Sequence, residues 1–238
     1  MSKNNQFFKV PNDMTTKKKL KPTDVLVYLY LKSYDNPEHQ CFPSLSTLSK
    51  VSGAAINTIR TSIKRLEDNG YITIQKENNR HYYYFPKEKE FQVFSPEFLH
   101  NDELSFKEKS YIAASQQYMY LDEKDIGKIS LTNQKLAKNL NISEDTLHRI
   151  DKSLTDKDLL VKVDTSAVDA ESGCNKTLKI YKLKELGQAV LWQVKKNTDD
   201  IEDLKTKNDK LEKTCDILLK EVAKLKKAQN IQENLTVS

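Results

Sequence analysis

Four polar side chains in segment 55–68 have the chemistry and the spacing needed to read DNA. The four are Asn57, Arg60, Thr61 and Lys64. If the segment is helical, they share one side of it, because residues three or four apart lie on the same helix face. Arg and Asn side chains can pair with base edges in the major groove, and a Lys ammonium pairs with phosphates. The spacing therefore predicts a helix that contacts double-stranded DNA.

The opposite side of the same segment is apolar. Its apolar residues are Ile56, Ile59, Ile63 and Leu66. They are spaced three, four and three residues apart, which is one helical stripe. The stripe predicts a core-facing helix from about Ala55 to Asp68, and Asn69-Gly70 then supplies the left-handed residue that can end it.

Two further helical patterns precede this segment. Segment 21–34, "KPTDVLVYLYLKSY", has a proline in its first turn, as a helix start often does. Its apolar face consists of Val25, Leu26, Leu29 and Tyr30. In the next pattern Ser44 is expected to cap a short helix that ends at Gly53. The apolar residues of that helix are Leu45, Leu48 and Val51.

The chain changes period after Gly70. "YITIQKE" and "HYYYF" are strand-like and are joined by Asn78-Asn79-Arg80, which predicts a hairpin with Arg80 at its tip. Three helices and a hairpin form a winged helix-turn-helix, in which Arg80 would reach a phosphate or the adjacent minor groove. The run of three tyrosines fits a strand that packs alternate rings better than a stacking platform for single-stranded bases.

The stretch "FPSLSTLSKVSGAAINTIRTSIKRLEDNGYI" resembles the helix-turn-helix domain of many phage and plasmid replication and regulatory proteins of low-GC Gram-positive bacteria. The shared pattern is an aromatic-Pro-Ser start, a Gly turn, a Ser-x-x-Thr opening and a Leu-Glu-x-x-Gly-Tyr/Leu-Ile close. The resemblance covers about residues 21–85 and implies that Thr58 touches a backbone phosphate. Ala55 departs from the pattern, since the family usually has a capping serine there, and a missing cap costs about 1 kcal/mol.

A different interpretation of these residues is that they only solvate an exposed helix in a winged domain that binds protein. The coincidence of basic groups with the groove-facing surface favours DNA. Lysines before the first helix would form an arm along phosphates, or else an ordinary solvated terminus. These lysines are Lys17, Lys18, Lys19 and Lys21.

Residues 105–182 repeat the same order of elements. Helices are expected at 105–120, 131–141 and 143–160, and strands at 160–165 and 176–183. Ser143 is a proper N-cap in this repeat, and Thr146 takes the place of Thr58. The candidate DNA contacts of the repeat are Thr146, His148, Arg149 and Lys152.

Acidic residues weaken the case for DNA binding by this second module. Glu144 and Asp145 suit the positive end of the helix dipole but repel phosphates. Asp151 and an acidic loop also count against a close fit to DNA. Together with the adjoining strand this loop forms an acidic wing, whose acidic residues are Asp164, Asp169 and Glu171. We therefore favour a winged-helix-like domain that mainly supports dimerisation or binds protein over a second DNA-binding module.

A seven-residue repeat occupies the C-terminal segment. Its a positions are Ile201, Asn208, Cys215 and Val222, and its d positions are Leu204, Leu211, Leu218 and Leu225. This repeat predicts a parallel two-stranded coiled coil whose register is set by Asn208. The g and e positions that would meet in a parallel dimer are opposite in sign: Asp200–Lys205, Lys207–Glu212 and Glu221–Lys226. A single helix that folds back on the body of the protein is the alternative.

Composition excludes several function classes. The net charge is +5, and residues 1–100 hold 15 Lys and Arg against 10 Asp and Glu, so a polyanion would dock there. Three widely separated cysteines fit a reducing cytoplasm rather than a disulfide scaffold or a zinc site. We find no signal-peptide core, no membrane-length apolar run and no catalytic motif. We therefore expect a cytoplasmic, non-enzymatic protein without metal or other cofactor.

The sequence as a whole predicts a mainly α-helical chain with small β-hairpins. Its expected parts are a basic arm (1–20), a winged helix-turn-helix domain (21–100), a second winged-helix-like domain (101–185), a parallel coiled coil (186–228) and a disordered tail (229–238). The predicted function is that of a homodimeric, sequence-specific binder of double-stranded DNA that controls replication or transcription of a plasmid or phage-type element. The predicted partners also include the replication or transcription machinery. The alternatives are a replication initiator proper, or a partition or adaptor scaffold whose winged domains mainly bind protein.

Overall fold

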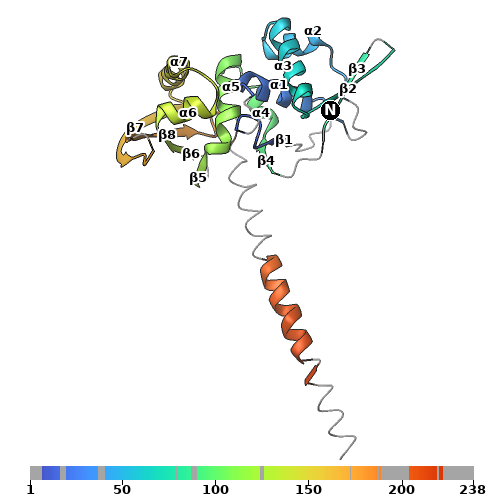
Figure 1. Ribbon diagram of the computed structural model, residues 1–238, viewed down its shortest axis with the longest axis vertical. Coiled ribbons are helices and arrows are strands. Elements are labelled where there is room, and N and C mark those ends of the chain that lie inside the picture. Colours follow the sequence, from blue (N-terminus) through green and yellow to red (C-terminus); the bar gives the residue numbers. More distant parts are fainter. Residues whose placement is uncertain are drawn as a thin grey trace, which may run out of the picture. The chain divides into compact units, whose positions relative to one another are not determined.

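The structure is a computed structural model of the chain (Figure 1). It describes residues 7–16, 20–36, 41–78, 80–86, 90–123, 126–171, 173–186, 188, 204–218 and 220–221. The chain divides into two compact units, residues 1–192 and 193–238. The first unit is a mixed α/β structure with an N-terminal helix-turn-helix region and small antiparallel sheets.

The N-terminal helices begin and end close to where the sequence predicts. They are α1 (Pro22–Lys32), α2 (Leu45–Ser52) and α3 (Ile56–Asp68). The Ser44 hydroxyl accepts the backbone N–H of Thr47 at 3.0 Å, which confirms it as the cap of α2. Gly53 ends α2 with φ +71°, and Gly70 follows α3 with φ +76°. Both stops thus use the left-handed conformation that glycine adopts at little cost.

The predicted hairpin is present as β2 (Thr73–Glu77) and β3 (Arg80–Tyr84). Cys41 forms an antiparallel bridge with Tyr83, whose N–H donates to the Cys41 carbonyl at 2.7 Å. The three tyrosines alternate as expected for a strand: Tyr83 is buried, whereas Tyr82 is half-buried and Tyr84 exposed. The hairpin projects from the helix-turn-helix region in Figure 1.

A strand near the N-terminus lies in a region that the sequence assigned to an arm. β1 (Phe8–Pro11) pairs antiparallel with β4 (Phe91–Phe94). Asn141 Nδ2 donates to the carbonyls of Thr15 and Leu20, at 3.1 and 3.2 Å. The chain on both sides of the lysine run is therefore attached to the folded unit. Lys17, Lys18 and Lys19 themselves lie outside the described residues.

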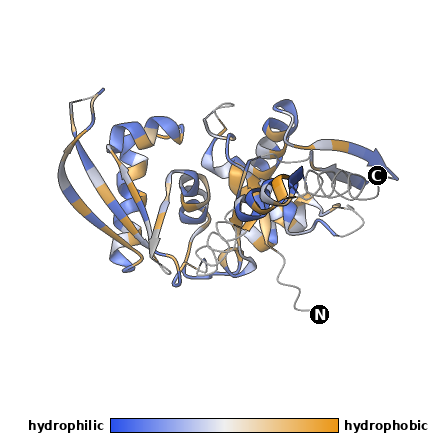
Figure 2. Cartoon of the chain, turned by 90° about the horizontal axis from the view of Figure 1, so that it is seen from below, coloured by the Kyte–Doolittle hydropathy of each residue, from blue (hydrophilic) through white to orange (hydrophobic). Residues whose placement is uncertain are grey.

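The second half of the unit contains more sheet than the sequence predicts. Its elements are α4 (Pro96–Leu99), α5 (Phe106–Ser115), the 3-10 turn η1 (Gln116–Tyr118), β5 (Tyr120–Glu123), β6 (Ile126–Leu131), α6 (Asn133–Asn139), α7 (Glu144–Asp156), β7 (Leu160–Val168) and β8 (Asn175–Lys182). The strands form an antiparallel sheet in the order β5-β6-β8-β7. The expected helix to residue 120 ends at Ser115, and "IGKIS" pairs with β8 as a strand. Figure 2 shows hydrophobic and hydrophilic residues alternating along the long strands at its left side.

The contact between α1 and α5 joins the two halves into one unit. α1 packs against both α3 and α5, and the core residues of the two halves form one continuous cluster. Consequently α1 is buried on nearly every side, from Val25 to Leu31, rather than along the single stripe that the sequence predicts. The sequence could not predict that α5 packs against α1. An all-apolar helix indicates that the helix is buried, but it does not indicate which element covers it.

The second unit is described as a helix over residues 204–218. The leucines of the heptad are exposed on it: Leu204 by 62%, Leu211 by 63% and Leu218 by 54%. Ile201, Val222 and Leu225, which complete the predicted seam, lie outside the described residues. In the part of the chain that the structure describes, these leucines are thus more than half exposed.

Candidate nucleic-acid interface

The helix α3 has one buried face and one polar, exposed face. Ile59, Ile63 and Leu66 are buried, as the stripe predicts. The four predicted contact residues, Asn57, Arg60, Thr61 and Lys64, are all exposed. Ile56 was expected in the stripe but is 41% exposed, because it lies in the first turn, where α3 leaves the core. The exposed face therefore begins with an apolar residue and continues with hydrogen-bonding and basic groups.

Two of the predicted contact residues are already joined. Arg60 Nη1 donates to Asn57 Oδ1 at 2.7 Å, and Thr61 Oγ1 donates to the Asn57 carbonyl at 2.8 Å. The Asn57 side chain thus holds the guanidinium against the helix, and one donor out of five on Arg60 is used. A side chain that is held before binding loses less conformational entropy when it binds.

The N-terminus of α3 has no side-chain cap. Ala55 occupies the cap position and provides no hydrogen bond, as its departure from the family pattern predicts. The first backbone N–H groups of a helix carry a partial positive charge, which suits a phosphate. Thr58 lies in this first turn and is half-buried. The same end of α3 thus combines open donors with the threonine that the resemblance assigns to a phosphate.

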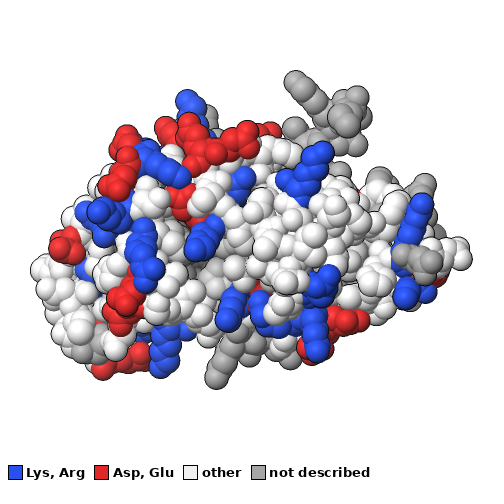
Figure 3. All heavy atoms as spheres, turned by 90° about the horizontal axis from the view of Figure 1, so that it is seen from above, with Lys and Arg blue, Asp and Glu red and all other residues white. Residues whose placement is uncertain are grey.

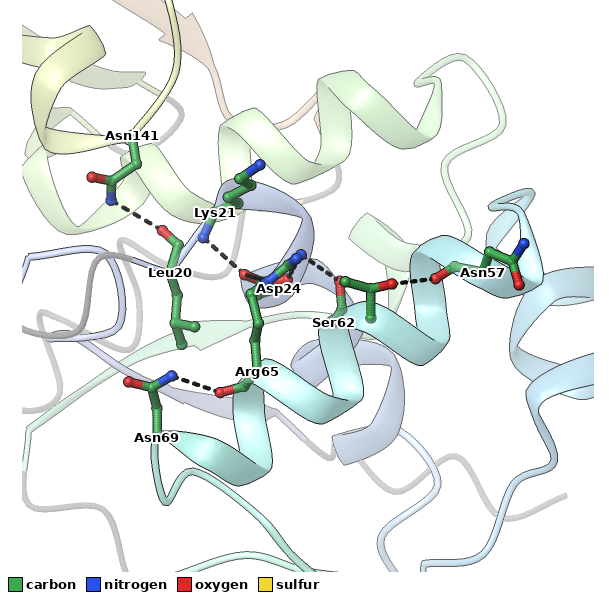
Figure 4. A network of polar contacts seen from close by, with 9 residues as sticks. Leu20, Lys21, Asp24, Asn57, Ser62, Arg65, Asn69 and Asn141 are labelled. Carbon is green, nitrogen blue, oxygen red and sulfur yellow. Dashed lines mark hydrogen bonds and ion pairs between the residues drawn. The ribbon is translucent and has the colours of Figure 1, made fainter.

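The C-terminal turn of α3 is fastened to α1 by an ion pair that the sequence analysis did not identify. Arg65 Nε and Nη2 donate to the two oxygens of the Asp24 carboxylate, at 2.9 and 2.6 Å, and Asp24 is fully buried (Figure 4). The Lys21 N–H donates to the same carboxylate at 2.9 Å. A signal was available, because Asp24 lies three residues after Lys21 at a helix start, where acids are favoured. Its partner Arg65 could not be found without the packing.

The hairpin presents its basic residues near one end. Arg80 is the first residue of β3 and lies opposite Glu77, so it stands beside the turn rather than at its tip. Lys76, Arg80 and His81 are exposed. The Arg80 guanidinium lies 5.8 Å from the centre of the Phe42 ring. The Arg80 side chain is therefore accessible for the predicted contact, and the exposed Phe42 ring lies beside it.

Comparison with known proteins agrees with this geometry. Residues 18–72 match the family described as the helix-turn-helix domain. The chain contains an N-terminal helix-turn-helix domain. A stretch of 54 residues is 37% identical to the protein named "Protein YmfN" of Escherichia coli (strain K12). That stretch spans 23% of this chain and 12% of the length of that relative. A helix-turn-helix domain suggests DNA binding, and α3 is the helix that follows its turn.

The helix α7 occupies the place in the second half that α3 occupies in the first, but the N-termini of the two helices differ. The Ser143 hydroxyl accepts the Thr146 N–H at 3.2 Å, which confirms the predicted cap. Glu144 and Asp145 occupy the first turn and are exposed. The cap and the two carboxylates occupy the positions where a phosphate would approach. His148, Arg149 and Lys152 are nevertheless exposed further along the helix.

The sequence suggested that Asp151 lies on the exposed face of α7, and this expectation is wrong. It is fully buried, and its carboxylate pairs with Lys179 Nζ at 2.5 Å and accepts the Tyr111 hydroxyl at 3.0 Å. The Tyr111 and Tyr181 hydroxyls are 3.0 Å apart. Burial lowers the pKa of Lys179, an effect that Asp151 partly offsets. Asp151 therefore belongs to a core polar network and does not weaken a DNA contact.

The acidic wing, which consists of Asp164 in β7 and of Asp169 and Glu171 in the loop after it, is partly neutralised. Lys135 of α6 lies 3.4 Å from Asp169 and 3.1 Å from Glu171. Asp169 is buried, whereas Asp164 and Glu171 remain exposed. In the view of Figure 3, most of the acidic side chains lie on the left half of the face, toward β7, and the right end carries mainly basic ones. The charge distribution thus favours the helix-turn-helix domain over the second half as the place for a polyanion.

Other kinds of site are not apparent in the described part of the chain. No group of three or more His, Cys, Asp and Glu side chains is placed to hold a metal ion there. Cys41 is buried, and Cys174 and Cys215 are exposed; none of these three described cysteines forms a disulfide. Among the described helices, none has the length and apolar character of a membrane span.

Proposed function

We propose that the chain is a homodimeric, sequence-specific binder of double-stranded DNA that controls replication or transcription of a plasmid or phage-type element. One observation carries the proposal: the exposed face of α3 holds Asn57, Arg60, Thr61 and Lys64 directly opposite its buried stripe. The link to a mobile element rests on the resemblance of residues 21–85 to replication and regulatory proteins.

In this proposal α3 enters the major groove. Arg60 and Asn57 pair with base edges through the donors that their mutual hydrogen bond leaves available, while Lys64 meets a phosphate. The uncapped N-terminus of α3 and Thr58 receive a second phosphate, since open helix donors favour an anion. Arg80 of the hairpin reaches the backbone or the minor groove beside the site, as the wing of a winged helix-turn-helix does.

We interpret the second half as a second winged-helix-like module related to the first. A matching contact supports this. Asp24 and Glu108 each lie three residues after a helix start, and each carboxylate binds the third helix of its own half: Asp24 holds Arg65, and Glu108 accepts the Ser153 hydroxyl at 2.7 Å. Arg65 and Ser153 are each ten residues after the N-cap of their helix. Because α7 is capped and acidic at its start, we assign the second module a supporting role rather than the main DNA contact.

Dimerisation is proposed to use a parallel coiled coil in the C-terminal segment. The exposed Leu204, Leu211 and Leu218 would form the d layers, with Asn208 and Cys215 at a positions. Two copies of α3 would then meet two half-sites, so that two modest affinities act together.

A scaffold role is the second candidate, and one surface favours it. Tyr120, Val161 and Val163 are exposed by 62%, 41% and 43% on one face of the four-stranded sheet. Exposed apolar patches on a soluble domain mark sites of association. In that case the winged modules would bind protein, and loss of basic residues from α3 would have little effect. In both candidates we propose a non-enzymatic protein without a cofactor.

Selection of bound duplexes from a random pool with the full-length chain tests the main proposal. We expect one recurring sequence. On that sequence Arg60→Ala should cost about 1–3 kcal/mol, and Lys64→Ala should weaken binding and flatten its salt dependence. Lys152→Ala is the matched control, because Lys152 is exposed at the position of α7 that corresponds to Lys64. A folded, dimeric chain that binds no duplex at low salt would refute the proposal. Binding to origin repeats or to a promoter of its own replicon would separate an initiator from a regulator.

A further inference from the structure

We propose that the outer face of the β2–β3 hairpin binds single-stranded nucleic acid by stacking unpaired bases on Phe42. This site is separate from the exposed face of α3 and does not rest on the proposed duplex function. Its residues are Phe42, Arg80, Tyr82 and Tyr84, with Tyr34 at its edge.

The strand register places these side chains on one face. Arg80, Tyr82 and Tyr84 alternate along β3, and Tyr83 between them points into the core with 1% exposure. The bridge between Cys41 and Tyr83 sets Phe42 beside Tyr82, and the two ring centres lie 5.4 Å apart. The face turned away from the core is therefore aromatic.

The rings are accessible. Phe42 is 44% exposed, Tyr34 37% and Tyr84 36%. Exposed apolar side chains that lie together in a patch mark sites of interaction. The Phe42 and Tyr82 rings are tilted by 54° and so are not stacked on each other. The Arg80 guanidinium lies over the Phe42 ring, 5.8 Å from its centre.

A hollow beside Phe42 carries a positive charge that suits a phosphate. Its lining residues are Tyr34, Asn36, Phe42, Pro43, Ser44, Thr47 and Arg80. Among these described residues the single charge is the Arg80 guanidinium, and there is no carboxylate. Glu77, opposite Arg80 in the register, is the one acid of the described hairpin strands. A base on Phe42 would thus place its phosphate near a cation.

This combination of groups selects the ligand class. Single-stranded nucleic acid binds where aromatic rings stack the bases and a cation follows the backbone, with little dependence on sequence. Paired bases cannot use the site, because their faces are covered by neighbours in the duplex. A protein that reads duplex DNA with α3 and holds an unpaired strand on the hairpin would stabilise DNA that has begun to open.

The test measures two probes with the same full-length protein. Fluorescence anisotropy would follow binding to an oligothymidylate of about 12 nucleotides, a length within the range of single-strand sites, and to the selected duplex. Phe42→Ala and Phe42→Leu should both weaken oligothymidylate binding about 5- to 100-fold, while Phe42→Trp should retain it. Duplex affinity should stay within about twofold, because stacking, not duplex contact, is lost.

Two controls keep the outcomes distinct. Tyr120→Ala removes an exposed ring on a different sheet and should change neither affinity, and Lys64→Ala should weaken the duplex alone. The proposal is overturned if the native chain does not bind oligothymidylate, if an abasic strand of equal length competes equally well, or if Phe42→Leu binds like the native chain. Failure of duplex binding with oligothymidylate binding intact would refute only the proposed duplex function.

Discussion

The Asp24 carboxylate receives two parallel hydrogen bonds from the Arg65 guanidinium, at 2.9 and 2.6 Å, across 41 residues of sequence (Figure 4). This pair joins the first turn of α1 to the last turn of α3. Because Arg65 lies on the same helix as Arg60 and Lys64, the pair sets the rotation of α3 about its own axis. The face offered to a ligand is therefore determined in part by a contact at its flank, since Arg65 is four residues after Thr61 on the same helix.

Asp24→Asn should weaken this attachment. Asn keeps the shape of Asp but loses the charge and one acceptor, and Arg65 then lacks its partner. We expect the free energy of unfolding to fall by about 2 kcal/mol; the loss is moderate because Arg65 is about one-third exposed. Urea titration would measure the loss. Asp68→Asn, which changes an exposed acid of α3, is the control, and equal stabilities for the two variants would contradict the expectation.

The buried pair of Asp151 and Lys179 should behave as a unit. Asp151→Asn leaves a buried ammonium without its counter-charge and should cost about 3–5 kcal/mol in unfolding free energy. Asp151→Ile combined with Lys179→Met should recover most of that loss. Ile63 occupies the equivalent position in α3, and the Tyr111 and Tyr181 hydroxyls can still bond each other at 3.0 Å.

Equilibrium unfolding of the two single variants and the double variant would give the coupling free energy. A double variant that is less stable than both single ones would show that the apolar replacement does not pack. A loss below about 1 kcal/mol for Asp151→Asn would show that the pair is not held as the structure has it.

Glu108 should make stability depend on acid pH. Burial raises the pKa of its carboxyl group, but hydrogen bonds from Lys157, Ser105 and Ser153 outweigh burial and bring the pKa from 4.5 down to about 2. Because the folded-state pKa is depressed, the stabilisation is complete above the ordinary pKa of 4.5. It is lost as the pH falls from there toward about 2.

Glu108→Gln should therefore lower the free energy of unfolding by about 2 kcal/mol at pH 7, a value reduced for the exposure of Lys157. The difference from the native chain should shrink steadily below pH 4.5. Denaturant titrations at pH 7, 4 and 3 would measure it, with the exposed Glu103→Gln as the matched control. A difference that is independent of pH would rule out this role for the carboxylate charge.

Cys215 reports on the proposed coiled coil. In a parallel, in-register dimer the two thiols at this a position face each other, so mild oxidation should link the chains. Non-reducing electrophoresis in a Cys174→Ser background would show a covalent dimer. Moving the thiol to an outward position, with Lys213→Cys and Cys215→Ser, should abolish the link. Equal linkage in both variants would mean random collision, and no linkage in the first would contradict the parallel register.

Local sequence was enough to predict the helix-turn-helix region. The Ser44 cap, the stops at Gly53 and Gly70 and the stripe of Ile59, Ile63 and Leu66 all appear as predicted. Each depends on interactions within a few residues, namely a cap hydrogen bond, a left-handed residue or a repeat of 3.6, and such signals are written in consecutive positions. The exposed face of α3 followed from the same periodicity.

Only the tertiary structure decided which distant residues meet. β1 and β4 pair across 80 residues, and "IGKIS" becomes a strand because β8 offers it a partner. Asp151 of α7 stands where α3 has the apolar Ile63. Its burial is possible because Lys179, 28 residues later in β8, supplies the opposite charge. Strand pairing and buried charge pairs depend on long-range contacts, so their free energy is not encoded in any local pattern. The same holds for the aromatic face at Phe42, which exists because the bridge at Cys41 sets that ring beside the hairpin.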